Sequence, residues 1–477
     1  MAHGLVLSAH PDLEVVSHST AETTLTLLGF ILDPLNPSRT SEDIVRDLAQ
    51  RCKDLADLLA GCEPLSGRWA LLLQNREGSW IFTDALGFRT VYYTSPELGT
   101  WCGSQPEIIK AAVGLEREDD EGLLAFVLNP RFARQESAWV GSRTIYKNCH
   151  RLLPNHFLKL GASQPVRFFP LVPLEKRGVE EIVAAAVGIL QGSFAAITRR
   201  TSLTQPITSG WDSRVLLAAS RHMAEHIEYY VDRQGALPEN HPDIWVPARL
   251  TKKMGLNFVL KNSEEILPGW FVGLLASNVT GARVLPKTRM IYARLMDGET
   301  RVNINGNGSE VCRNYYESRF GLNPCNPSTE ELAQGLGYPG MTFVIQELEE
   351  WRAGLAASGT NDVNILDLLM WEQDLGTWGA QYPAEQDLAV EEFSPFNCRR
   401  LLTTLLSAPR ELRAGPHHPL YRQLIEAMWP ELLAFPFNPP PKLTLHFSHL
   451  LPTLKQQLRP YLPQPVSRWL RKRRHLF

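Results

Sequence analysis

LTQPITSGWDSRVLLAASRHM, residues 203–223, joins a short hydrophobic strand to a helix through a turn that contains Gly210. Small and hydroxyl residues in such a turn let backbone N–H groups approach an anion, and the following helix presents the positive end of its dipole. The turn lacks the Gly-Lys-Ser/Thr ending of a Walker loop. The stretch therefore predicts a pyrophosphate-binding loop between a strand and a helix.

The residues of this loop have chemistry that suits a nucleotide. The hydroxyls of Thr208, Ser209 and Ser213 can donate to phosphate oxygens, and Gly210 leaves the backbone accessible. The carboxylate of Asp212 can hold Mg²⁺. The same pattern can also form an N-capped turn. The position between a strand and a helix is what favours nucleotide binding.

Strands and helices alternate on both sides of the loop. A long helical pattern precedes it at residues 180–200, and the stretches that follow read as strand 227–232, helix 243–255, strand 257–261 and strand-then-turn 301–309. Strands that alternate with helices imply parallel β-α-β units. From about residue 325 onward the pattern is mostly helical. We therefore expect an α/β parallel-sheet domain with C-terminal helices.

The first part of the chain reads differently. Short runs rich in β-branched and aromatic residues occur at residues 24–32, 68–75, 79–85 and 90–95, separated by Gly, Pro and Asn. One helical stretch, residues 41–61, lies among them, with Ser41 as its N-cap. We therefore expect an antiparallel β-sandwich before the α/β domain.

Composition narrows the class of protein. The chain has 477 residues, 44% of them hydrophobic and 21% charged, with a net charge of −3. A nucleic-acid-binding protein usually has a basic domain, and this chain has no large excess of basic residues, which argues against that class. No apolar run is long enough to span a bilayer, and no signal peptide is apparent, so we expect a cytoplasmic protein. The seven cysteines form no Cys-x-x-Cys pair. The basic tail at residues 468–477 reads as a solvated end, or as a contact with anionic lipid or a partner.

Two segments carry a family resemblance. The loop ITSGWDSR resembles the Ser-Gly-Gly-x-Asp-Ser loop of ATP-pyrophosphatases (the adenine nucleotide α-hydrolase-like fold), specifically the asparagine synthetase and β-lactam synthetase superfamily. Residues 302–316, VNINGNGSEVCRNYY, resemble that family's second acidic loop, with Gly306, Gly308 and Glu310 in order. Glu310 replaces the usual Asp and Val311 the following Glu. The resemblance implies that ATP and Mg²⁺ bind here, with Asp212 and Glu310 as metal ligands.

The resemblance extends to further candidate residues. AVEEFSPFNCRRLL, residues 389–402, resembles the segment whose Glu helps to deprotonate the attacking amine, which makes Glu391 a candidate general base. Lys442 falls where the family carries a Lys that stabilises charge on the phosphates. On the strand IEYYVD, the residues Tyr229, Val231 and Asp232 are candidates to flank the adenine, and Val231 is the residue that we expect to contact it.

The N-terminal part resembles a class II glutaminase. Residues that match its motifs are Asp84, Gly87, Arg89, Tyr92, Tyr93, Leu153, Pro154 and His156. Such an enzyme uses an N-terminal Cys as its nucleophile, whereas residue 2 here is Ala and the first fifty residues contain no Cys. We therefore expect an inactive glutaminase-like domain at residues 1–172 and an asparagine-synthetase-like domain at residues 173–477.

The implied enzyme is an AMP-forming carbon–nitrogen ligase. It would adenylate a small-molecule or peptide carboxylate, release pyrophosphate and pass the acyl group to an amine, as β-lactam synthetases and lasso-peptide cyclases do. Two alternatives stay open, an ammonia-dependent asparagine synthetase and a degenerate, non-catalytic nucleotide-binding protein. The identity of both substrates and homo-oligomerisation stay open as well.

Overall fold

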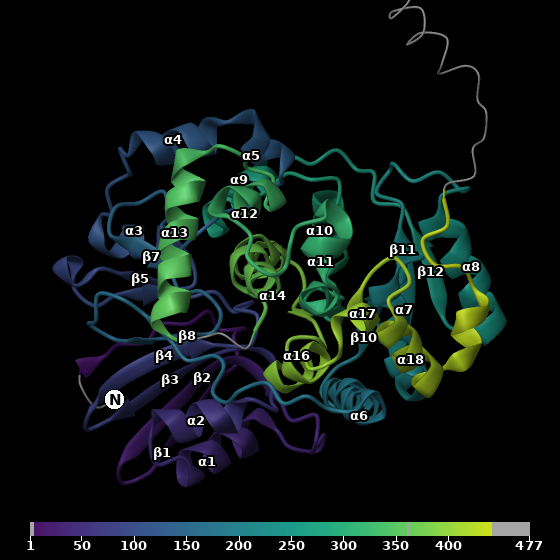
Figure 1. Ribbon diagram of the computed structural model, residues 1–477, viewed down its shortest axis with the longest axis horizontal. Coiled ribbons are helices and arrows are strands. Elements are labelled where there is room, and N and C mark those ends of the chain that lie inside the picture. Colours follow the sequence, from purple (N-terminus) through teal and green to yellow (C-terminus); the bar gives the residue numbers. More distant parts are fainter. Residues whose placement is uncertain (1–3, 360–362, 441–477) are drawn as a thin grey trace, which may run out of the picture. The chain divides into compact units, whose positions relative to one another are not determined.

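The N-terminal part is built on a six-stranded antiparallel sheet. In the computed structural model, which describes residues 4–359 and 363–440 (Figure 1), its strands lie in the order β1-β2-β3-β4-β8-β9. Their bounds are β1 Val15–Ser19, β2 Thr23–Leu32, β3 Ser66–Asn75, β4 Gly78–Thr83, β8 His156–Lys159 and β9 Val166–Arg167. The register pairs each strand antiparallel to its neighbour.

Both faces of this sheet are covered. On one face Trp69 and Leu71 pack in a cluster with Leu48 of α1 (Ser41–Arg51) and with residues of α2 (Leu55–Cys62). On the other face Leu72 packs with Tyr93, which belongs to a second, three-stranded antiparallel sheet. Its order is β6-β5-β7, with bounds β5 Tyr92–Thr94, β6 Cys102–Gly103 and β7 Cys149–Arg151. The predicted antiparallel, β-rich N-terminal part is therefore confirmed.

A five-stranded parallel sheet forms the second part. Its order is β12-β11-β10-β13-β14, and every pairing is parallel. The bounds are β10 Leu203–Pro206, β11 Ile227–Asp232, β12 Phe258–Lys261, β13 Val302–Ile304 and β14 Glu392–Phe393. The predicted α/β arrangement with a parallel sheet is confirmed, and the mixed α+β layout with it.

Helices connect and cover the sheets (Figure 1). In the N-terminal part they are η2 Pro96–Leu98, α3 Pro106–Val113, α4 Glu121–Leu128 and α5 Pro130–Arg134. Around the parallel sheet they are α6 Val179–Thr198, α7 Trp211–Ala219, η3 Arg221–His226, α8 Pro242–Met254, α9 Gly269–Asn278, α10 Thr288–Asp297 and η4 Ser309–Cys312. The rest are α11 Tyr315–Phe320, α12 Thr329–Gly335, α13 Thr342–Ala357, α14 Ile365–Leu368, η5 Leu369–Gly379, α15 Ala380–Gln386, α16 Arg399–Leu406, α17 Arg410–Arg413, α18 Pro419–Met428 and η6 Pro430–Ala434.

The helix predicted at residues 41–61 is two helices. Cys52 ends α1 in an extended conformation, and the side chain of Asp54 then caps α2 by accepting from the amide of Asp57. The predicted N-cap, Ser41, is the first helical residue. Thr40 caps α1 instead, in a capping box with Asp43. A polar segment with its own N-cap therefore divides the predicted helix, although the helical spacing of the apolar residues continues through it.

One helix is apolar and long enough to cross a membrane by length and composition. It is α6, the longest helix among the described residues. Ile182, Leu190 and Phe194 on this helix are fully buried in the largest hydrophobic cluster, and α6 packs against α7, α16 and α18. These contacts are those of a core helix.

A buried carboxylate ties the antiparallel part to the helical part. Glu372 of η5 is fully buried and accepts hydrogen bonds from Asn155 (2.9 Å), Arg167 (2.7 Å) and Trp351 (2.7 Å). Burial, the largest single effect, raises the pKa of Glu372, but Arg167, His156 and Trp351 together lower it below its ordinary value. The described residues up to Asn438 form one compact unit, and the division at residue 172 stays a prediction.

Candidate functional site

The two loops singled out in the sequence lie side by side. The first follows β10 and begins α7, and the second follows β13, the parallel neighbour of β10. The carboxyl ends of parallel strands share one edge of the sheet, where α/β proteins bind ligands. A Cβ atom on Gly306 would lie 3.0 Å from the Cβ of Asp212, a tighter contact than most Cβ atoms make, so the absence of a side chain at Gly306 helps the loops to approach this closely. The structure therefore brings the predicted phosphate loop and acidic loop together.

Asp212 and Glu310 meet through a third side chain. One Nη atom of Arg313 lies 3.2 Å from Asp212 Oδ2 and 3.3 Å from Glu310 Oε1. The other carboxylate oxygen of Asp212, Oδ1, is buried and accepts no hydrogen bond. Burial raises the pKa of Glu310, while the Arg313 guanidinium acts in the opposite direction. Both predicted metal ligands therefore share one internal cation.

The hydroxyls of the phosphate loop are engaged within the loop and with α8. Ser213 Oγ accepts from the amide of Thr208 and lies 3.0 Å from Thr208 Oγ1. The amide of Gly210 donates to Thr208 Oγ1 (3.2 Å). Ser209 donates twice to Asp243 Oδ1, from its amide at 2.8 Å and from its hydroxyl at 2.7 Å. An internal carboxylate therefore occupies the two Ser209 donors.

The loop and the first turn of α7 are braced by the segment before residue 439. Phe437 stacks on Trp211 with ring centroids 3.7 Å apart, and the amide of Asn438 donates to the carbonyl of Ser209 (3.0 Å). The buried guanidinium of Arg214 donates to the carbonyl of Leu432 (2.9 Å) and faces the Phe437 ring. The variable position of the loop, Trp211, thus has a packing role.

Two further predicted residues are buried close by. Val231 lies near the end of β11 and is 5% exposed, so little of its side chain is free to touch a ligand in this state. Gly308 has φ +104°, and a Cβ there would lie 2.5 Å from a methyl of Leu86. The absence of a side chain at Gly308 therefore allows the acidic loop to pack against the N-terminal part.

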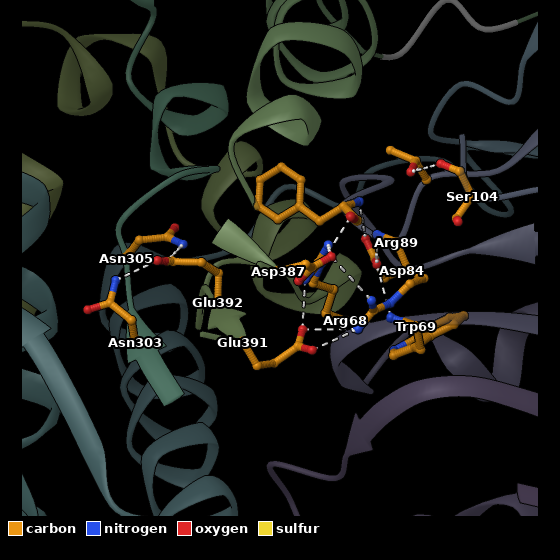
Figure 2. Close-up of polar contacts among 12 residues, drawn as sticks. Arg68, Trp69, Asp84, Arg89, Ser104, Asn303, Asn305, Asp387, Glu391 and Glu392 are labelled. Carbon is orange, nitrogen blue, oxygen red and sulfur yellow. Dashed lines mark hydrogen bonds and ion pairs between the residues drawn. The ribbon is translucent and has the colours of Figure 1, made fainter. Parts of the chain in front are cut away.

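Glu391 points toward Arg68 and Arg89, on the side opposite to Asn303 and Asn305 (Figure 2). Its carboxylate accepts from Arg68 at 2.8 Å and from Arg89 at 3.0 and 3.1 Å, and Arg68 also donates to Asp387 (2.7 Å). Burial alone would raise the pKa of Glu391, but Arg89 and Arg68 lower it. A carboxylate that is held ionised by two guanidinium groups is a weak base, so this geometry favours a structural role. The base role stays a prediction.

The motif around Asp84 has a structural explanation. Asp84 is fully buried and accepts from the amides of Trp69 (3.1 Å), Phe88 (2.9 Å) and Arg89 (2.9 Å), as Figure 2 shows. These bonds fix the turn that aims Arg89 at Glu391. The Asp-x-x-Gly-x-Arg pattern therefore builds the contact between the two parts of the chain.

The neighbouring Glu392 is the better buried of the two acids. It accepts from Asn303 and from Asn305, each at 2.7 Å, and is 1% exposed (Figure 2). Arg294 lies 3.7 Å away. Burial raises the pKa of Glu392 to about 7, although Arg294 acts in the opposite direction. Glu391, which precedes β14, and Glu392, which lies on β14, therefore face two different polar networks.

Some predictions fall outside the site or outside the described residues. Lys442 and the basic tail at 468–477 lie beyond residue 440. Within residues 4–359 and 363–440, no group of three or more His, Cys, Asp or Glu is arranged to hold a metal. A cavity of about 380 Å³ lies between residues 169–177 and α16, and none of the predicted site residues lines it.

Sequence reasoning missed Arg313 and Asp243. Arg313 follows Glu310 by three residues in a 3₁₀ turn, a spacing that brings opposite charges together. Asp243 stands in the first turn of α8, after a His-Pro pair that begins the helix. Asp243 lies outside the quoted motifs, and Arg313 lies within residues 302–316 at a position to which the motif assigns no role, so the motifs gave no reason to choose either residue.

Comparisons with known proteins add no relative to this geometry. No protein-family model matches the chain, and a search of curated proteins finds no match. The site therefore has to be interpreted from its own residues.

Proposed function

We propose that this protein uses ATP and Mg²⁺ to adenylate a carboxylate and then transfers the acyl group to an amine, as an asparagine-synthetase-like ligase with an inactive glutaminase-like N-terminal part. The observation that carries the proposal is the meeting of two loops at the carboxyl edge of a parallel sheet. Asp212 and Glu310, one from each loop, both pair with the guanidinium of Arg313.

The residues suit a divalent cation once Arg313 moves aside. Asp212 Oδ1 is buried with no partner, and oxygen ligands of this kind are what Mg²⁺ prefers. Asp212 and Glu310 would hold the ion, which would supply positive charge to offset the phosphates. Two carboxylates are few for a metal, so the remaining ligands would come from ATP and water.

The loop residues have roles in binding the phosphates. The amides at the N-terminus of α7 point the positive end of the helix dipole toward the anion. The hydroxyls of Thr208, Ser209 and Ser213 would exchange their present partners for phosphate oxygens. With no Walker Lys in the loop, these groups would hold the β- and γ-phosphates as a leaving pyrophosphate, and most catalysis would come from positioning and charge.

We expect the purified protein to bind ATP only when Mg²⁺ is present. Without the ion, the carboxylates of Asp212 and Glu310 would face the phosphates with like charge. Calorimetric titration with ATP should give a binding isotherm with Mg²⁺ and none with a chelator. Equal affinity in the two titrations would remove Asp212 and Glu310 from the metal role.

We also expect no release of glutamate from glutamine. The four cysteines of the N-terminal part are Cys52, Cys62, Cys102 and Cys149, and burial raises the pKa of the Cys52, Cys62 and Cys149 thiols. A thiol with a raised pKa is a poor nucleophile at neutral pH. An enzymatic glutamate assay over a range of pH tests this. Glutamate formation in proportion to the protein would show that the N-terminal part is an active glutaminase.

A second candidate function is non-catalytic nucleotide binding. The observation that favours it is that Arg313 and Asp243 already occupy the ionic partners of the site. A site that keeps its internal ions would bind nucleotide weakly and cleave none. An ammonia-dependent asparagine synthetase stays an alternative for the identity of the amine, which would be ammonia supplied free.

A further inference from the structure

Two charged side chains occupy the proposed nucleotide site from inside. The Arg313 guanidinium lies within 3.3 Å of oxygens of both Asp212 and Glu310, where a divalent cation would sit. Arg313 is largely buried, with 16% of its side chain exposed, so the charge is not free to move into solvent without rearrangement. Arg313 thus already compensates the negative charges of Asp212 and Glu310 in the free protein.

The donors that would bind a phosphate are also already occupied by a charged side chain. Asp243 Oδ1 accepts from both the amide and the hydroxyl of Ser209, a pair of donors on one oxygen. This is the arrangement that a phosphate oxygen would make with the loop. Asp243 comes from α8, which follows β11, so the anion is supplied by a different element from the loop that it contacts.

We propose that Arg313 and Asp243 are built-in substitutes for the metal and a phosphate, which keep free Mg²⁺ and free pyrophosphate out and are displaced together by the metal–nucleotide complex. The proposal rests on the proposed function and adds a selection rule to it. A metal alone must displace a guanidinium from two carboxylates, and an anion alone must displace a carboxylate from two donors. The complex brings both replacements at once.

The rule predicts that removing Arg313 opens the cation position. Mn²⁺ titrations followed by electron paramagnetic resonance, without nucleotide, should show weak binding to the wild type. Arg313→Met should bind Mn²⁺ more tightly by roughly 5- to 150-fold, if the loss of Arg313 acts with the strength typical of coupling between two binding events. The matched control is Arg319→Met, an exposed arginine of α11. Unchanged Mn²⁺ affinity in a folded Arg313→Met protein would overturn the proposal.

Asp243→Asn supplies a second test that does not need Arg313→Met to fold. Removing the charge of Asp243 should tighten the binding of inorganic pyrophosphate, measured by calorimetry with a chelator present, by roughly 5- to 150-fold. Asp297→Asn, an exposed change at the end of α10, is the control. Pyrophosphate affinity equal to that of the wild type would overturn the proposal.

The two tests separate this proposal from the proposed function. If the variants behave as expected but the wild type binds no Mg²⁺–ATP, the internal ions are real and the ligase function fails. If the wild type binds Mg²⁺–ATP but neither variant gains affinity, the ligase function stands and the role of Arg313 and Asp243 fails.

Discussion

Glu372→Gln is expected to lower the free energy of unfolding by about 3–5 kcal/mol, the usual cost of breaking a buried ion pair by removing one partner. Glu372 and Arg167 are both buried, at 0% and 5% side-chain exposure. The neutral amide would leave the Arg167 guanidinium buried without its counter-charge. It would also replace one acceptor oxygen with an NH₂ group. That donor would then face the N–H donor of Asn155 or of Trp351, and one hydrogen bond would be lost.

Urea unfolding followed by tryptophan fluorescence measures this change, with Glu349→Gln, an exposed position on α13, as the control. The lowered pKa of Glu372 means that its stabilisation is present above the unfolded-state pKa and is lost as the pH falls through the folded-state pKa. The difference between wild type and variant should therefore narrow below about pH 4.3. A loss under 1 kcal/mol would show that Glu372 does not tie the two parts together.

The fold followed from the sequence where the patterns were local. Short runs rich in β-branched and aromatic residues predicted β2, β3 and β4, and the strand–turn–helix pattern at residues 203–223 predicted β10 and α7. The two-residue strand β14 was missed because Glu392 and Phe393 lie in a mostly helical region and pair only with a distant strand. No local pattern specifies a strand that short. The break at Cys52 was missed because the helical spacing continues across it.

The site was predictable in its loops and not in its ion pairs. Each motif follows a strand, and the carboxyl ends of neighbouring parallel strands lie at the same edge of a sheet. Asp212 and Gly306 are therefore close together. The partners of Asp212 and Glu391 depend on tertiary contacts between residues far apart in the sequence, Arg313 for Asp212 and Arg68 for Glu391. Sequence spacing carries no information on those contacts.

Asp212→Asn is expected to reduce ATP cleavage by roughly 10²- to 10³-fold, the loss typical when one group that stabilises developing charge is removed. The amide would remove one of two anionic ligands from the proposed metal position. It would also free Arg313 from half of its ion pair. Because 25% of the Asp212 side chain is exposed, we expect the variant to stay folded.

Measuring the initial rate of pyrophosphate release with Mg²⁺–ATP and a small-molecule extract tests this variant. Asp297→Asn, exposed at the end of α10, should keep the wild-type rate. Circular dichroism melting should give Asp212→Asn a midpoint close to that of the wild type. A folded Asp212→Asn protein with undiminished release would remove Asp212 from the reaction.

The identity of the phosphate products tests the proposed chemistry most directly. Wild-type protein, Mg²⁺–ATP and a small-molecule extract should be followed by ³¹P NMR, with Asp212→Asn as the control for contaminating enzymes. Because the loop at residues 207–214 has no Walker Lys, cleavage should fall between the α- and β-phosphates. We predict AMP and pyrophosphate in equal amounts, dependent on the wild-type protein. ADP and inorganic phosphate formed by the wild type and not by the variant would contradict an adenylating ligase.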